Sequence, residues 1–167
     1  MGTLEISIAV GALVGAAAAW IVTGPARRRK RAVEEALGQA RALVEKSPDD
    51  DGARVRLARV QLEVAKRPDD ALATLGPVVE RNRHHWTKGE KPTLALVGDA
   101  LADQGRLDEA IETFESFVGA IGEYETGGDS ERKWELETHK VEAEQRIRLL
   151  KRGDTHVHRP EQWGDAN

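Results

Sequence analysis

The feature that most constrains this chain is an uninterrupted apolar run close to its start. Residues 6–23, which read ISIAVGALVGAAAAWIVT, contain no charged side chain. An α-helix rises about 1.5 Å per residue, so a helix of this length spans roughly 27 Å, close to the thickness of the hydrocarbon core of a bilayer. Trp20 lies near one end of the run, where an indole suits the membrane interface. The run therefore predicts a transmembrane helix.

The charges that flank this run predict its orientation. No Lys or Arg precedes the run, whereas a basic segment follows it, made of Arg27, Arg28, Arg29, Lys30 and Arg31. The positive-inside rule then places the N-terminus outside and the rest of the chain in the cytoplasm. The abundance of Ala, Arg, Gly and Asp suggests that this membrane is the inner membrane of a bacterial-type cell. The same cations are expected to contact anionic lipid headgroups. The alternative is a cleaved signal peptide and a secreted protein, although such a peptide carries its cations ahead of its apolar stretch.

Small residues recur on one face of the predicted span. Gly11, Gly15 and Ala19 are spaced four residues apart, and this spacing lets two helix backbones approach closely. We therefore expect these residues to pack against a second span, either in a homodimer or in another membrane protein. The alternative is chance, because glycine and alanine are common in membrane helices.

The remainder of the chain is acidic and has the composition of a helical protein. The whole chain has a net charge of -4, and residues 32–167 alone contain 20 Lys and Arg against 28 Asp and Glu, a net charge of -8. This balance gives no electrostatic attraction for nucleic acid, so no nucleic-acid partner is expected. The chain has no cysteine, which excludes disulfides and thiolate metal sites. Ala, Leu, Glu and Arg are abundant, and they favour helix over sheet.

One segment in this part of the chain has the pattern of a helical hairpin. Leu94, Val97 and Leu101 share one face of a first helix. Gly98 on that face allows close approach of a partner helix. Gly105 follows the helix, where a glycine with a positive φ angle commonly ends it.

The second helix of this hairpin begins with two carboxylates and has its own apolar stripe. Acidic residues suit the positive end of a helix dipole, and Asp108 and Glu109 occupy that place here. The stripe consists of Ala110, Phe114, Phe117 and Ile121.

This spacing resembles the tetratricopeptide repeat, a helical hairpin of 34 residues. The segment from Leu94 to Gly122 matches best, and weaker matches cover residues 36–48 and 55–78. The second of these has one extra residue in its turn, and Pro77 near the middle of its second helix predicts a kink or an early break. The resemblance implies stacked hairpins that form a groove for protein partners.

The expected fold is all-α, with a transmembrane helix followed by a short helical array and a C-terminal capping helix. Residues 1–31 form the anchor, 32–152 the tetratricopeptide-like domain, and 153–167 a flexible tail. The last helix should pack on the preceding hairpin through Trp134, Val141, Ala143, Ile147 and Leu150. Helices are predicted at residues 26–47, 50–66, 69–82, 91–104, 107–121 and 129–152.

The family resemblance also implies which residues would line the groove. By position, these are Val55, Arg59 and Leu62 in one unit and Ala95, Asp99 and Ala102 in the next. They depart from the Lys and Asn clamp with which some family members bind chaperone C-termini, so that ligand is not expected.

No motif of a catalytic or metal site is present. The sequence lacks phosphate-binding, nucleophile-elbow and zinc-protease motifs, so neither an enzyme nor a cofactor is predicted. His84 and His85 are adjacent and do not converge on a helix, so no metal site is expected. Trp86, in the linker between two hairpins, is expected to fold back on the domain.

These features predict a non-catalytic membrane adaptor, which recruits or scaffolds proteins at the cytoplasmic face. The alternative is a structural accessory subunit of a larger membrane complex. One span, a basic segment and helical repeats also resemble the layout of the lipopolysaccharide assembly protein B family. That family adds a cysteine-based rubredoxin-type domain, which this chain lacks, so a role in lipopolysaccharide synthesis is not implied.

Overall fold

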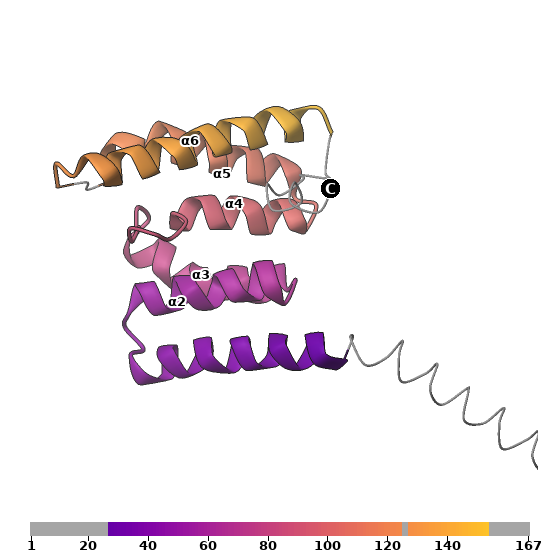
Figure 1. Ribbon diagram of the computed structural model, residues 1–167. Coiled ribbons are helices and arrows are strands. Elements are labelled where there is room, and N and C mark those ends of the chain that lie inside the picture. Colours follow the sequence, from indigo (N-terminus) through magenta and orange to yellow (C-terminus); the bar gives the residue numbers. More distant parts are fainter. Residues whose placement is uncertain (1–26, 125–126, 154–167) are drawn as a thin grey trace, which may run out of the picture.

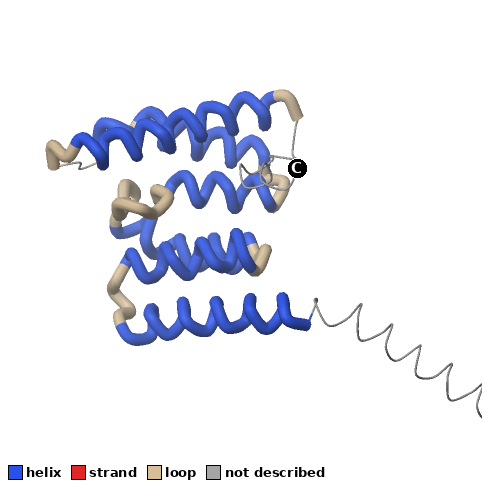
Figure 2. Tube along the Cα trace, viewed as in Figure 1, coloured by secondary structure: helices blue, strands red, loops and turns tan. Residues whose placement is uncertain are grey.

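The computed structural model describes residues 27–124 and 127–153, and these form an array of helices that run alternately in opposite directions (Figure 1). Every regular element in these ranges is helical (Figure 2), which confirms the all-α prediction for this part of the chain. Among the described helices, none is both long and apolar enough to cross a membrane. The predicted span at residues 6–23, with Gly11, Gly15 and Ala19, lies outside the described residues.

All six predicted helices of this part are present, and their ends lie within two residues of the predicted ones. Each helix packs against the next in the chain, so that α2 contacts α3, α3 contacts α4, α4 contacts α5 and α5 contacts α6. A helix over residues 27–46 precedes α2 (Asp51–Arg59), η1 (Val60–Val64), α3 (Pro68–Arg81), α4 (Thr93–Asp103), α5 (Leu107–Gly119), η2 (Ile121–Glu123) and α6 (Ser130–Lys151).

Two glycines shape the α4–α5 hairpin as predicted. A Cβ atom on Gly98 would lie 2.7 Å from Cε1 of Phe114, so only glycine lets α5 approach this closely. Gly105 has a φ angle of +78° and ends α4, and the N–H of the following Arg106 donates to the carbonyl of Leu101. The positive φ angle turns the chain back into α5.

The extra residue in the turn between α2 and α3 is absorbed by η1, which is a π-helix. The N–H of Ala65 donates to the carbonyl of Val60 at 2.9 Å, a bond five residues apart, so one more residue fits into the same helical turn. Lys66 then adopts a positive φ angle of 57°, which places it at the tip of the turn.

The core consists of clusters that follow the order of the helices. The largest joins α4, α5 and α6 around the buried rings of Phe114 and Phe117. A second joins α2, α3 and α4, and a small third cluster holds Leu37 and Ala40 against Leu57 of α2. Full burial of each large side chain contributes about 1.5–3 kcal/mol, so most of the hydrophobic stabilisation lies in the later hairpins.

The expected early break at Pro77 is wrong, because α3 continues through this residue to Arg81. A proline inside a helix removes one N–H donor and crowds the preceding turn. Here Leu75 and Val78 are buried on either side of Pro77, and their packing against α2 and α4 holds the helix together.

The predicted packing face of α6 is wrong in part. Trp134 is 70% exposed and Val141 58% exposed, whereas Leu136, Ala143 and Leu150 are buried against α5. The three buried residues recur every seven positions and form one stripe. Trp134 precedes Leu136 by two residues, and Val141 precedes Ala143 by two residues. Two residues correspond to about 200° around a helix, so Trp134 and Val141 face outward. Ala143, Ile147 and Leu150 do pack on the hairpin as predicted.

Candidate partner-binding face

Three of the residues predicted to line a groove lie inside the core. Val55 of α2 and Leu62 of η1 are buried against α3, and Ala95 of α4 is buried in the largest cluster. Their side chains are not exposed to a ligand in this arrangement. Ala102 is partly buried against the same cluster.

The other two residues, Arg59 and Asp99, contact consecutive residues of the loop between α3 and α4. Nη1 of Arg59 donates to Oε2 of Glu90 at 2.5 Å, and Nζ of Lys91 donates to Oδ2 of Asp99 at 2.7 Å. Nε of Arg56 lies 3.4 Å from Oε1 of Glu90. The loop therefore brings charged residues of α2 and α4 together on one face.

This loop, residues 82–92, is fixed by Trp86. The indole is 9% exposed, its Nε1 donates to the carbonyl of Glu90 at 2.9 Å, and the guanidinium of Arg132 lies 5.1 Å from the ring centroid. The expectation that Trp86 folds back on the domain is confirmed. Nζ of Lys88 donates to Glu131, and the N–H of Gly89 donates to Glu135, so the loop also contacts the start of α6.

Helix α6 completes the face with residues that the sequence interpretation missed. Nη2 of Arg146 lies 3.3 Å from Oδ1 of Asp99, and Nδ1 of His139 lies 3.3 Å from Oε2 of Glu142. The hydrogen bond with His139 lowers the pKa of Glu142, burial opposes this shift, and the cations Lys91 and Arg146 add to the lowering. His139, Glu142 and Arg146 follow a spacing of three and four residues, and that polar stripe could have been recognised.

We call this set of residues the charged face. It carries guanidinium, ammonium and carboxylate groups, and its ion pairs join α2 to the loop, the loop to α4, and α4 to α6. This arrangement is suited to recognising a charged partner. Within the described ranges, no group of three or more His, Asp and Glu residues could hold a metal ion. The charged face consists of Arg56, Arg59, Glu90, Lys91, Asp99, His139, Glu142 and Arg146.

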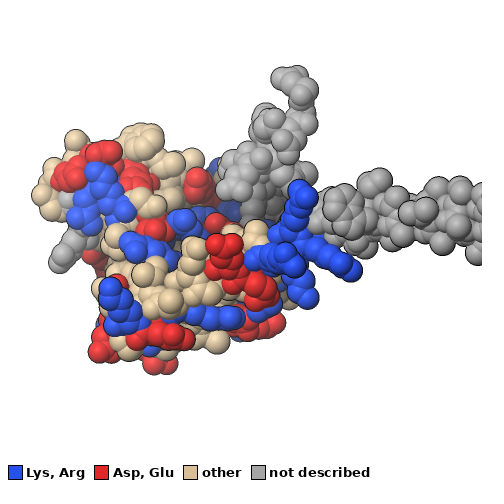
Figure 3. Space-filling view, turned by 60° about the horizontal axis from the view of Figure 1, so that its bottom comes forward, with Lys and Arg blue, Asp and Glu red and all other residues tan. Residues whose placement is uncertain are grey.

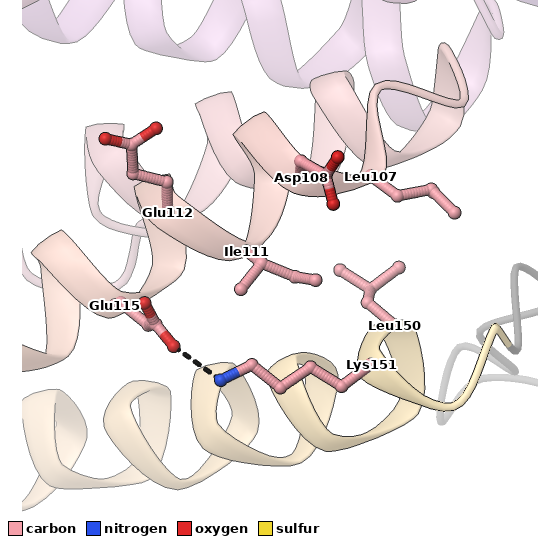
Figure 4. A pocket seen from close by; sticks show the side chains of 7 residues that line it. All are labelled: Leu107, Asp108, Ile111, Glu112, Glu115, Leu150 and Lys151. Atoms are coloured by element: carbon pink, nitrogen blue, oxygen red, sulfur yellow. Dashed lines mark hydrogen bonds and ion pairs between the residues drawn. The ribbon is translucent and has the colours of Figure 1, made fainter.

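A shallow cavity of about 450 Å³ lies between α5 and the end of α6. Figure 4 shows Ile111 and Leu150 facing one another across it, with Glu115 and Lys151 joined at one side by a hydrogen bond of 2.7 Å. The lining residues are Leu107, Asp108, Ile111, Glu112, Glu115, Leu150 and Lys151.

The basic segment lies at the start of the helix over residues 27–46, and all five of its residues are exposed. Figure 3 shows Lys and Arg side chains gathered at this end of the molecule. The cations are therefore available to an external anionic partner.

No family model matches this chain, and neither a curated protein nor a solved structure matches it.

Proposed function

We propose that this protein is a membrane-tethered adaptor with a tetratricopeptide-like domain, which binds a protein partner at the cytoplasmic face of the inner membrane. The observation that carries the proposal is the charged face, to which α2, α4, α6 and the loop over residues 82–92 all contribute. The tether is proposed from the apolar run at residues 6–23 and the basic segment that follows it.

The charged face offers a way to bind an acidic segment of a partner. Arg56 and Arg59 are about half exposed, and both contact the single carboxylate of Glu90. A guanidinium can form two parallel hydrogen bonds to a carboxylate, so an acidic side chain of a partner can compete with Glu90 for either arginine. Asp99 is buried between Lys91 and Arg146 and keeps the local geometry fixed while this exchange occurs.

A second candidate, a structural subunit of a larger membrane complex, is favoured by the outer face of α6. Trp134 and Val141 lie seven residues apart on this helix and are largely exposed. Exposed aromatic side chains of this kind are common anchors of protein interfaces. In such a complex, another subunit would cover this face permanently.

Affinity purification of the full chain in detergent, with one variant on each face, separates the two functions. In an adaptor, Arg56→Gln should release soluble partners that exchange readily, while Trp134→Ser should not. In a structural subunit, Trp134→Ser should release a stoichiometric set of membrane subunits that resists salt. Arg41→Gln, at an exposed position of the first helix, is the matched control for the loss of one arginine.

The proposed location has its own test. A reporter fused after residue 167 should be active only in the cytoplasm, because the basic segment is proposed to retain the domain there. Cleavage of the domain by an external protease in intact spheroplasts would favour the secreted alternative.

A further inference from the structure

The helical array has two ends, which differ in charge. Because successive helices run in opposite directions, the start of the first helix, the η1–α3 turn, the α4–α5 turn and the end of α6 lie together at one end (Figure 1). We call this the anchor-side end, and it comprises residues 27–31, 65–70, 103–109 and 148–153. The opposite end, which we call the loop end, comprises residues 43–51, 81–91, 120–124 and 127–133.

The anchor-side end is strongly basic, whereas the loop end is nearly neutral. The anchor-side end contains eleven Lys and Arg and five Asp and Glu, a net charge of +6. The loop end contains seven Lys and Arg and eight Asp and Glu, a net charge of -1. An acidic domain therefore presents one positive end.

The cations at the anchor-side end are largely free of internal partners. Within the described ranges, Lys66, Arg152 and the basic segment form no ion pair and are exposed. Several acidic groups near this end are already paired, since Arg67 lies 3.2 Å from Glu34 and Arg106 lies 2.5 Å from Glu109. The positive charge is thus left available on the surface.

One of these exposed cations, Lys66, lies in the turn between η1 and α3. Its φ angle of 57° lies in the left-handed region, which glycine adopts without strain and which other residues adopt rarely. Here a lysine occupies the position and places an ammonium group at the tip of the turn.

We propose that the anchor-side end docks flat on an anionic lipid surface, so that the helices stand along the membrane normal. This inference rests on the proposed tether. At most about 3.6 Å per residue separates Thr23 from Arg27, so the first helix begins within about 14 Å of the end of the apolar run. The cations of the two turns and of α6 lie at the same end and reach the headgroups together.

The same geometry keeps the loop end away from the membrane. The first helix has 20 residues, so it places the loop end about 30 Å from its start. The Debye length at physiological salt is about 8 Å, and cations at the loop end therefore contribute nothing to lipid binding. The loop over residues 82–92 then faces the cytoplasm, where a partner can reach it.

Single-cysteine labelling of the full chain tests this orientation, because the natural sequence has no cysteine. A fluorophore is attached at Val64→Cys, close to the anchor-side end, or at Ser47→Cys, at the loop end. The protein is reconstituted in phosphatidylcholine vesicles with or without phosphatidylglycerol, both containing a headgroup quencher. We expect the fluorophore at position 64 to be quenched only on vesicles with phosphatidylglycerol. This quenching should disappear in 0.5 M salt, where the Debye length is about 4 Å. The fluorophore at position 47 should not be quenched on either kind of vesicle.

A matched pair of variants tests which cations act. Lys66→Asn with Arg152→Gln removes two unpaired cations from the anchor-side end, and asparagine tolerates the left-handed conformation. Each cation near an anionic surface contributes about a 5-fold change, so the ratio of docked to undocked domain should fall about 25-fold. Lys46→Gln with Lys133→Gln removes the same charge from the loop end and should leave quenching unchanged.

The outcomes distinguish the orientation from the tether. If the protein floats with phosphatidylcholine vesicles, the proposed tether is supported. If quenching is then equal at positions 64 and 47, or does not depend on phosphatidylglycerol, the proposed orientation is overturned. Failure to float with phosphatidylcholine vesicles, together with salt-sensitive quenching at position 64 on anionic vesicles, overturns the tether and supports the docking surface. An equal effect of the two double variants overturns the assignment of the anchor-side end.

Discussion

The close approach of α4 and α5 at Gly98 makes a quantitative prediction about its replacement by alanine. In most helices this change is stabilising by about 1 kcal/mol, because glycine is a poor helix former. Here the added Cβ atom would lie 2.7, 2.8 and 2.9 Å from three ring carbons of Phe114. The ring is 2% exposed, so it has no free space into which to move. Overpacking of this kind costs about 1–3 kcal/mol. We therefore expect Gly98→Ala to be less stable than the natural protein by about 1 kcal/mol.

Gly38 provides the matched control. It lies inside the helix over residues 27–46, is exposed, and would have nothing within 4 Å of an added Cβ atom. Gly38→Ala should therefore raise stability by about 1 kcal/mol. The difference between the two variants isolates the clash with Phe114, at about 1–3 kcal/mol.

Thermal unfolding of the full chain in detergent, followed by circular dichroism at 222 nm, measures both effects. A change of 1 kcal/mol shifts Tm by about 4 °C in a domain of this size. In Phe114→Leu, the smaller side chain should accept the Cβ atom, so Gly98→Ala should cost at least 1 kcal/mol less in that background. Equal Tm values for Gly98→Ala and Gly38→Ala would refute the close approach of the two helices.

Three further predictions concern the turn, the loop and the charged face. Gly105→Val should lower the free energy of unfolding by about 2 kcal/mol, because a β-branched residue resists the φ angle of +78°. Gly105→Asn should lower it less, and thermal melts of the two variants measure the difference. Trp86→Ala should cost about 3–5 kcal/mol in urea titrations, because the buried indole fixes the loop, whereas a cost below 1 kcal/mol would contradict its packing. The pKa of Glu142 lies below its ordinary value of 4.5 in the folded state. Ionised Glu142 therefore stabilises the folded state above pH 4.5, and this stabilisation is lost as the pH falls through the lowered pKa. Glu142→Gln should therefore make unfolding less dependent on pH below 4.5, and an unchanged dependence would contradict its contact with His139.

The helices could be predicted from the sequence because their signals are local. Gly98 and Gly105 mark a close contact and a turn within one hairpin, and the apolar stripe of α5 leads directly to Phe114 and Phe117. In α6, by contrast, Trp134 and Leu136 both suggest a buried face, and only packing against α5 decides between them. The continuity of α3 at Pro77 likewise depends on neighbours outside the helix.

The charged face was predictable only in part, because its contacts join residues far apart in the chain. The resemblance to the tetratricopeptide repeat implied corresponding positions for Arg59 and Asp99 in two units. It gave no indication that the loop residues Glu90 and Lys91 would reach them, or that Arg146 would approach Asp99 from α6. Such ion pairs depend on the relative position of two hairpins and α6, which no short stretch of sequence encodes.

The uneven distribution of the core has a mechanical consequence. The helix over residues 27–46 is held by a cluster with only three buried residues, whereas eleven form the cluster around α5. If the chain is tethered before residue 27 and a partner binds the charged face, any pulling force between membrane and partner passes through this first helix. Its contact with α2 buries the fewest residues, so under force this helix would separate from α2 before the later hairpins unfold. The separated segment would then lengthen the tether, while the later hairpins stay folded.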